Sequence, residues 1–422
     1  MLTRRGLTLS VLALFLAAVP AAAQQKEVVI GLLYPLSGPT ASAGVDEKHV
    51  YELFADMVNG KEAMLPGPFY QKLKGLSGFA GGARLRLIFV DHQGKPDVGQ
   101  AETERLITQE KVHALIGSWQ SSVTATTSQV AERFGVPFLT AESASPGLTR
   151  RGFKWFFRTS PHDEHFSQAM FDFMADFQKK KGVKLETVAI TNEDTLFGHD
   201  SAKVQRTLAQ KYGYRIVADF GYRANSTSLT AEVQKLKAAS PDVWLPTSYQ
   251  SDAILFNRTS KELDWNPRMI LAQNAGHIDP KFIEQTGKDS DGYMTRSPFP
   301  SDRIDQNPMA KALNGPYRAR SGKDLYDLPA RAATGIMTLV DAINRAGSTD
   351  PEAIRKALIA TDVKPSDLIM PWTGVKFDES GQNVGVRAII MQLQGGKYHT
   401  VWPFDMATRD AIFPIPRWSE RR

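Results

Sequence analysis

The sequence predicts an α/β protein made of two doubly wound, Rossmann-like lobes. The first observation is that short apolar runs, rich in β-branched residues, alternate with longer stretches of helical periodicity. The second is the length of 422 residues, which corresponds to two or three domains of ordinary size. The third is that the alternating pattern begins anew after Pro161. Alternating strands and helices favour βα units, and hence a largely parallel sheet in each lobe.

Eight strands are predicted, each a short apolar run beside turn-forming residues. They cover residues 28–33, 85–90, 112–116, 136–139, 188–190, 216–220, 243–245 and 269–271. Between them, apolar residues recur at three- and four-residue spacing and predict helices. The clearest of these are residues 98–110, 123–133, 165–179, 201–212, 229–238 and 328–346. The Pro/Gly-rich segment 65–82 interrupts this rhythm and is interpreted as an inserted surface loop.

The first 23 residues have the three parts of a cleavable export signal. Arg4 and Arg5 give a positive start, residues 11–18 an apolar middle, and residues 21–23 a run of alanines suited to cleavage. A membrane anchor is the alternative, but the apolar run is shorter than the roughly 20 residues that span a bilayer. We therefore expect cleavage near Ala23 and an exported chain that is not embedded in the membrane.

The composition excludes several kinds of chemistry. The chain has no cysteine, so it has no disulfide framework, no cysteine zinc site and no thiol nucleophile. Its net charge of +6 is spread along the sequence rather than gathered in basic runs interleaved with aromatic residues. We therefore expect no nucleic-acid partner.

Motifs typical of enzymes are absent from the sequence. It has no nucleophile elbow, no phosphate loop, no HExxH zinc motif and no GxGxxG turn after the first strand. His162 and His165 bracket two carboxylates at helical spacing and could present metal ligands. Ser160 and Pro161 before them favour instead a helix start, where acidic side chains stabilise free backbone amides. We therefore predict no catalytic residue, no metal site and no cofactor.

A series of short motifs runs through nearly all of the chain after the export signal. They are Ile-Gly-Leu-Leu-Tyr-Pro-Leu-Ser-Gly-Pro at 30–39, then residues 91–96, 117–124, 135–137, 145–149, 157–159, 197–198 and 291–292. In order and spacing they resemble the periplasmic leucine/isoleucine/valine-binding proteins. The sequence is identified as a member of that family on this resemblance.

The resemblance implies the type I periplasmic binding fold, in which three crossovers join two lobes around a ligand cleft. It places residues 24–162 and 299–382 in the first lobe, and residues 163–298 and 383–422 in the second. It implies a monomer that captures a small polar ligand by hinge closure and delivers it to the permease subunits of an ABC importer in the inner membrane. A sensor that docks on a membrane receptor is the alternative, and a periplasmic enzyme is less favoured.

The resemblance also assigns ligand contacts to the first lobe. In the family, the loop after the third strand holds the ligand carboxylate, and Ser121 matches the family's serine, with Trp119 and Ser122 beside it. A serine hydroxyl and the amides of the following helix would donate to an anion. A capping role for Ser121 and a core position for Trp119 are the structural alternatives.

The next loop departs from the family pattern. It reads Glu142, Ser143 and Ala144, and Ala144 stands at the position of a threonine that contacts the amino acid in the family. Glu142 would repel an anionic ligand unless it points away or meets a cation.

In the second lobe, Gln273 stands at the position of the acidic residue that grips the amino group in the amino-acid binders. A neutral glutamine weakens the expectation of an amine at this point. Phe197, which replaces a family tyrosine, and Ser248 with Tyr249 complete the expected polar and aromatic wall. Two ligand classes stay open: a zwitterion with rearranged contacts, and an amine-free molecule such as an amide, a urea-like compound, an alcohol or an aromatic acid.

Overall fold

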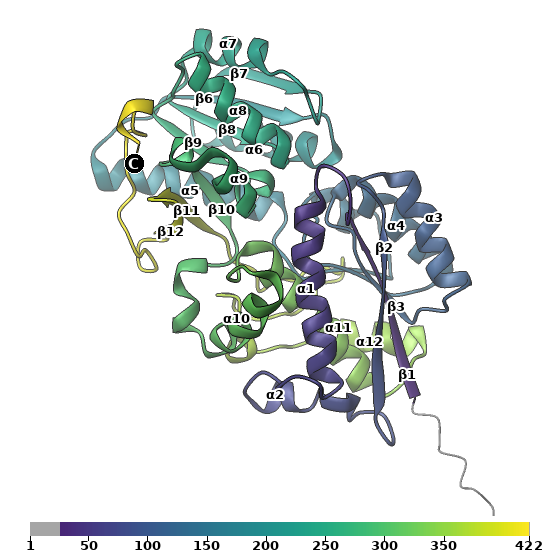
Figure 1. Cartoon of the computed structure of the whole chain (residues 1–422). Helices are drawn as coiled ribbons and strands as arrows, with labels where there is room; N and C mark the ends of the chain where they lie inside the picture. Colours follow the sequence, from purple (N-terminus) through teal and green to yellow (C-terminus); the bar gives the residue numbers. More distant parts are fainter. Residues whose placement is uncertain (1–25, 422) are drawn as a thin grey trace, which may run out of the picture.

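The computed structural model describes residues 26–421, and the predicted export signal lies outside the described residues. The first lobe is built on a parallel five-stranded sheet in the order β2-β1-β3-β4-β5 (Figure 1). Its strands are β1 (Lys26–Tyr34), β2 (Ala83–Asp91), β3 (Ala114–Gly117), β4 (Phe138–Thr140) and β5 (Phe156–Arg158).

Helices cover both faces of this sheet because β1 is apolar on both sides. Val28, Ile30 and Leu32 face one core, which contains α1 (Ala41–Val58) and α11 (Asp327–Ala346). Val29 and Leu33 alternate with them and face a second core, and α3 (Pro96–Thr108) and α4 (Ser121–Phe134) cover that face. The remaining helices of this lobe are α2 (Pro68–Gln71), α10 (Pro308–Ser321) and α12 (Pro351–Ile359).

The second lobe is built on a seven-stranded sheet in the order β12-β11-β10-β9-β8-β6-β7. β6 (Thr187–Glu193), β7 (Arg215–Tyr222), β8 (Val243–Thr247), β9 (Met269–Ala272) and β10 (Met294–Ser297) are parallel, whereas β11 (Ile389–Gln394) and β12 (Lys397–Trp402) join antiparallel. Its helices are α5 (Asp163–Lys181), α6 (Leu196–Lys211), α7 (Thr230–Ala239), α8 (Gln250–Glu262) and α9 (Pro280–Thr286).

The chain passes between the lobes three times. It leaves the first lobe between β5 and α5, returns between β10 and α10, and leaves again before β11. The buried guanidinium of Arg158 ties two of these crossings together, because it donates to Gln382 Oε1 at 2.6 Å and to the Ser145 carbonyl at 2.7 Å. The predicted fold class of two α/β lobes with mostly parallel sheets is confirmed.

All eight predicted strands are present, within a few residues of the expected ends. β5, β10, β11 and β12 were not among the predictions. β5 and β10 have only three and four residues, and the sequences of β11 and β12 mix glutamine, histidine and lysine with apolar residues. Short or mixed runs carry too little periodicity to be recognised.

The interpretation of segment 65–82 as a surface loop was wrong. The segment forms α2 and a 3₁₀ turn at Lys74–Leu76, and its apolar side chains belong to the core of the first lobe. These buried side chains are Leu65, Tyr70, Leu73, Leu76 and Phe79. The Tyr70 hydroxyl also donates to the Asp367 carbonyl at 2.6 Å. The proline and glycine residues shape the turns, while the apolar residues between them pack on α1 and α11.

No helix in the stretch from residue 26 to residue 421 combines the length and apolar character that a membrane crossing requires.

We predict that Leu73→Ala lowers the free energy of unfolding by about 2–5 kcal/mol, because it leaves a cavity in a core that the fully buried Leu73 fills. Urea unfolding measures this loss. Lys72→Ala is the matched control, since the neighbouring Lys72 side chain is exposed. Equal effects of the two substitutions would mean that the segment does not contribute to the core.

Candidate functional site

A cavity lies between the two lobes, where the carboxyl ends of β3, β4, β6, β8, β9 and β10 meet. Its lining residues in the first lobe are Trp119, Ser121, Glu142, Ala144, Leu328 and Arg331, and in the second lobe Phe197, Tyr249, Asn274, Ala275 and Arg296. Ligands of doubly wound α/β proteins bind at this edge of the sheet. The cavity volume is about 20 Å³, which holds about one water molecule, so the lobes are closed upon each other.

Six of the ten residues predicted from sequence line this cavity. They are Trp119, Ser121, Glu142, Ala144, Phe197 and Tyr249. The other four lie behind the wall or beside it. Ser143 donates to the Trp119 carbonyl, Ser248 accepts a hydrogen bond from Tyr222, Gln273 is fully buried, and Ser122 is half-buried next to Ser121.

Three aromatic side chains form one side of the cavity. The Trp119 and Tyr249 rings meet across the lobes with centroids 5.0 Å apart, and Phe197 stacks on Tyr249 at 5.7 Å. Trp119 has a φ of 65°, a backbone conformation that a bulky residue rarely adopts. Such strain is typical of ligand sites, where the surrounding structure holds the residue in place. Ser143 does so here, through its 3.0 Å hydrogen bond to the Trp119 carbonyl.

Arg296, on β10, is the most unusual residue of the site. Its side chain is 2% exposed, and neither Nε nor Nη1 has a hydrogen-bond partner. Its Cζ atom lies 3.5 Å from the centroid of the Phe166 ring, so one face of the guanidinium is covered while the donors in its plane stay unpaired. The nearest anion is Asp163, whose Oδ1 is 3.7 Å from Nη2. An unpaired buried donor costs free energy, and its presence in a cavity wall indicates a site for an acceptor.

Asp163 explains why Gln273 does not reach the cavity. Gln273 Nε2 donates to Asp163 Oδ1 at 2.9 Å, and Ser201 donates to Oδ2 at 2.8 Å. Burial raises the pKa of Asp163 to about 6, and the positive charge of Arg296 opposes this rise. Burial also lowers the pKa of Arg296 to about 9, which keeps the guanidinium protonated at neutral pH. Gln273 therefore bonds to Asp163, the carboxylate nearest Arg296, and lies outside the cavity lining.

A second buried arginine belongs to the first lobe. Arg331 donates from Nε to Asp327 Oδ1 at 2.7 Å and from Nη1 to the Glu142 carbonyl at 3.0 Å. Asp327 Oδ2 accepts hydrogen bonds from Asn274 at 2.8 Å and Ser297 at 2.9 Å. Asn274 and Ser297 come from the second lobe, so this buried carboxylate connects both lobes at the cavity.

Glu142 faces a pair of tyrosines rather than an exposed cation. Its carboxylate accepts hydrogen bonds from Tyr34 at 3.1 Å and Tyr51 at 3.4 Å, and these two hydroxyls bond to each other. Burial raises the pKa of Glu142 to about 7, although Arg331 opposes the rise. Burial, and the charge of Glu142, also raise the pKa of Glu47, whose two carboxylate oxygens have no hydrogen-bond partner.

Four helices begin at the cavity. They are α4, α6, α8 and α11, whose first residues or adjacent loops supply Ser121, Phe197, Tyr249 and Leu328 to the lining. The free amides and the macrodipole of each N-terminus favour negative charge. The helix starts therefore add to the positive potential of Arg296 and Arg331.

His162 and His165 act as a helix cap. The His162 ring accepts a hydrogen bond from the Glu164 amide at 3.2 Å, and the His165 ring accepts one from the His162 amide at 3.3 Å, so the two complete a capping box on α5. Burial lowers the pKa of His162 to about 2 and also lowers that of His165. Over residues 26–421, the structure has no group of three or more metal-ligating side chains placed to hold an ion.

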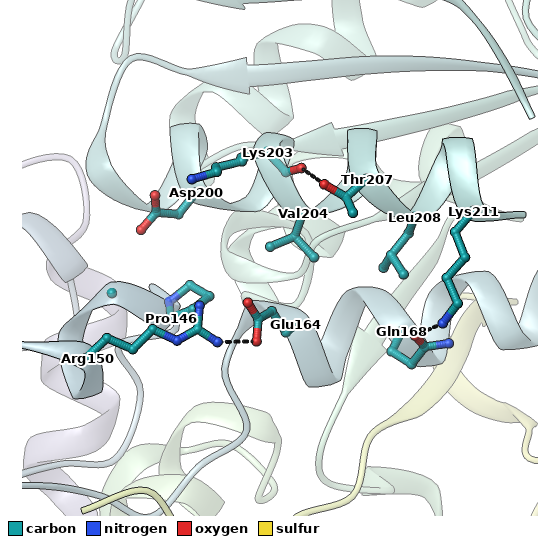
Figure 2. A pocket seen from close by; sticks show the side chains of 11 residues that line it. Pro146, Arg150, Glu164, Gln168, Asp200, Lys203, Val204, Thr207, Leu208 and Lys211 are labelled. Carbon is teal, nitrogen blue, oxygen red and sulfur yellow. Dashed lines mark hydrogen bonds and ion pairs between the residues drawn. The ribbon is translucent and has the colours of Figure 1, made fainter. Parts of the chain in front are cut away.

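A larger groove of about 530 Å³ lies on the outside of the molecule, between the loop at Pro146 and helices α5 and α6 (Figure 2). Arg150 from the first lobe and Glu164 from the second are 2.5 Å apart there. Lys203 and Lys211 extend from α6 along its edge. The groove has a mixed lining of apolar, polar and charged side chains, of which Arg150, Lys203, Thr207 and Lys211 are exposed to solvent, whereas the smaller cavity has buried, incompletely paired groups. The smaller cavity is therefore the candidate ligand site.

The sequence analysis missed five lining residues, namely Asn274, Ala275, Arg296, Leu328 and Arg331. Arg296 lies on a four-residue strand that was not predicted. Leu328 and Arg331 lie at the start of the predicted helix 328–346. The predicted start of this helix was the sequence feature from which these two lining residues could have been found. Asn274 and Ala275 directly follow Gln273, so the alignment at this strand end was one residue short of the cavity.

Comparisons with known proteins agree with this arrangement. A family model described as "Periplasmic binding protein" matches residues 27–397. "Leu/Ile/Val-binding protein homolog 7" of Brucella abortus is 28% identical over 421 residues, which cover 97% of this chain and 98% of the relative.

Two solved structures share the fold. The substrate-binding protein of a branched-chain amino acid transporter from Streptococcus pneumoniae, in complex with isoleucine, has a TM-score of 0.74 at 20% identity and covers 92% of this chain and 100% of its own. An ABC-transporter solute-binding protein from R. palustris, in complex with benzoate, has a TM-score of 0.73 at 18% identity. The match covers 89% of this chain and 95% of that protein.

We predict that Glu142→Gln makes stability less dependent on pH. The folded protein holds the Glu142 proton up to a pKa of about 7, whereas the unfolded chain releases it near its ordinary value. The proton therefore stabilises the folded wild-type protein at about pH 4, and this stabilisation is lost as pH rises through about 7. The free energy of unfolding should fall by about 3 kcal/mol over this range. Thermal unfolding of wild type and variant across this range measures the difference. The exposed Glu284→Gln is the control, and parallel curves for Glu142→Gln and wild type would contradict the prediction.

Proposed function

The chain belongs to the periplasmic binding protein family, and on that premise we propose that it is an extracytoplasmic solute-binding protein. It captures a small polar solute between its lobes and delivers the closed complex to an ABC-type importer in the inner membrane. Members of this family bind solutes rather than transform them, which sets aside the enzyme alternative.

The observation that carries this proposal is the division of the cavity wall between the lobes. Trp119, Ser121 and Arg331 come from the first lobe, and Tyr249 and Arg296 from the second. A solute that contacts both sets is bound fully only when the lobes close. Binding therefore shifts the equilibrium between open and closed forms by the difference in affinity, and a transporter can distinguish the two forms.

The names of similar proteins support a transport role and leave the solute open. The Brucella relative is named for leucine, isoleucine and valine, while the two solved structures contain isoleucine and benzoate. Because one fold accommodates such different ligands, the side chains of this chain's own cavity must decide its ligand.

The organisation expected from the sequence completes the proposal. The chain is exported to the periplasm after cleavage near Ala23, and its lobes comprise residues 24–162 with 299–382 and residues 163–298 with 383–422. The end of β5 at Arg158 and the start of α5 at Asp163 support placing the first division between them. Of the ten residues predicted from the sequence to contact the ligand, we propose the six that line the cavity as contacts. They are Trp119, Ser121, Glu142, Ala144, Phe197 and Tyr249.

We predict that ligand protects a thiol introduced at Ser42 from modification. Ser42 on α1 is 8% exposed, bonds to Asp279 and accepts a hydrogen bond from Gln250 of the opposite lobe at 3.4 Å. Lobe opening would expose a cysteine at this position, and the absence of native cysteine makes it the only thiol. The measurement is the rate of maleimide labelling of the ligand-stripped protein with L-leucine, L-isoleucine, benzoate, acetamide or glycerol.

A binding solute should slow the labelling of Ser42→Cys and leave that of Ser228→Cys unchanged, because Ser228 is exposed on the second lobe. The same solute should add about 2.7 kcal/mol of stability at about 100 times its Kd. Stabilisation without slower labelling at position 42 would contradict capture by lobe closure.

A further inference from the structure

We infer that the solute is a monocarboxylate with a planar, apolar body and no α-amino group, and that Arg296 is the residue that binds its carboxylate. This inference rests on the proposed function, since it names the solute that the same cavity takes. Three features of the cavity point to such a solute: the unpaired donors of Arg296, the arrangement of the carboxylates, and the aromatic contact between the lobes.

The guanidinium of Arg296 is buried, charged and incompletely bonded. Nε and Nη1 have no partner, and the nearest anion, Asp163, lies 3.7 Å from Nη2, beyond hydrogen-bond distance. Asp163 already receives hydrogen bonds from Gln273 and Ser201. The unused donors require an acceptor from outside the protein, and a carboxylate on the solute supplies both the acceptor and the opposite charge.

A ligand ammonium group would find no comparable partner. Gln273, the residue aligned with the amine-binding acid, turns away from the cavity towards Asp163. Asn274 Oδ1 accepts from the Ala275 amide, and Asp327 is bonded to Arg331, Asn274 and Ser297. Glu142 is the one carboxylate in the lining, and both of its oxygens face the hydroxyls of Tyr34 and Tyr51. The lining therefore provides unpaired charged donors at Arg296, whereas its one carboxylate, Glu142, already accepts hydrogen bonds from two tyrosines, and the unpaired Glu47 lies outside the lining.

The aromatic contact between the lobes selects the shape of the solute. Trp119 and Tyr249 belong to opposite lobes, and their centroids are 5.0 Å apart with the rings tilted by 34°. A planar group between two rings needs about 3.5 Å on each side, so a modest opening of the cleft would let a flat apolar body replace this contact. Phe197 stacks behind Tyr249 and keeps that ring in place.

The test uses isothermal titration calorimetry on the ligand-stripped, full-length mature protein. The acids are benzoate, 4-hydroxybenzoate, phenylacetate and cinnamate, and the comparison compounds are benzamide, L-phenylalanine and L-leucine. We expect at least one acid to bind, and benzamide to bind about 30-fold or more weakly than benzoate where benzoate binds, because a neutral amide leaves the charge of Arg296 buried and unpaired. These comparisons need no variant and are unaffected by any folding defect.

Arg296→Gln should weaken the binding of the same acid by about 30-fold or more, while Arg133→Gln should leave it unchanged. Arg133 is a matched control because its side chain is exposed on the first lobe and pairs with Glu104 of the same lobe, away from the cavity. Circular dichroism establishes that both variants are folded. Arg296→Lys, which keeps the charge and loses the planar donors, should bind with intermediate affinity.

Four results would overturn the inference while leaving the proposed function intact, and the first three come from the comparisons above. They are binding of L-leucine or L-phenylalanine at least as tight as that of every acid, equal binding of benzamide and benzoate, and unchanged binding by a folded Arg296→Gln. Failure of all four acids also overturns it. Failure of the proposed function looks different: no compound of either panel binds or protects the thiol at position 42.

Discussion

The closed arrangement of the two lobes depends on one buried carboxylate, Asp327, at the start of α11. It accepts hydrogen bonds from Arg331 of its own helix and from Asn274 and Ser297 of the opposite lobe. Because Asp327 is 1% exposed, none of these donors can be replaced by solvent without opening the interface. The same contacts set the position of Asn274, and with it the wall of the cavity. The hydrogen bonds that hold the lobes closed therefore also fix the shape of the cavity.

Near Asp327 the protein buries charged groups whose incomplete pairing lowers the stability of the folded state. Arg296 has unpaired donors, Glu47 has two unpaired oxygens, and burial raises the pKa of Glu142 to about 7. Such groups lower stability unless a ligand or a neighbour compensates them, and proteins retain them mainly at functional sites. Arg158 shows the contrast. It is equally buried, but its donors reach Gln382, Ser143, Ser145 and Thr149, so it serves the hinge and leaves nothing for a ligand.

Most of the fold could be predicted from the sequence, because periodicity records which faces of each element are buried. The candidate site could be predicted where the family resemblance extends to the loops after the strands, as at Ser121, Ala144 and Tyr249. Arg296 lies on a four-residue strand, and its environment is made by Phe166 and Asp163, more than a hundred positions earlier in the chain. Gln273 shows the limit of alignment, since it directly follows β9 but its side chain bonds to Asp163 behind the cavity, and the next two residues line the cavity instead.

The measurement that tests this account most directly is a crystal structure of the protein with a bound aromatic acid from the calorimetric panel. The account predicts that the lobes close on the acid with the cleft slightly wider than here, and that the carboxylate lies within hydrogen-bond distance of Arg296 Nε or Nη1. It also predicts that the ring lies between Trp119 and Tyr249. A carboxylate held at Ser121 with Arg296 still unpaired would contradict the assignment of Arg296. An acid bound in the outer groove between α5 and α6 would contradict the assignment of the cavity as the solute site.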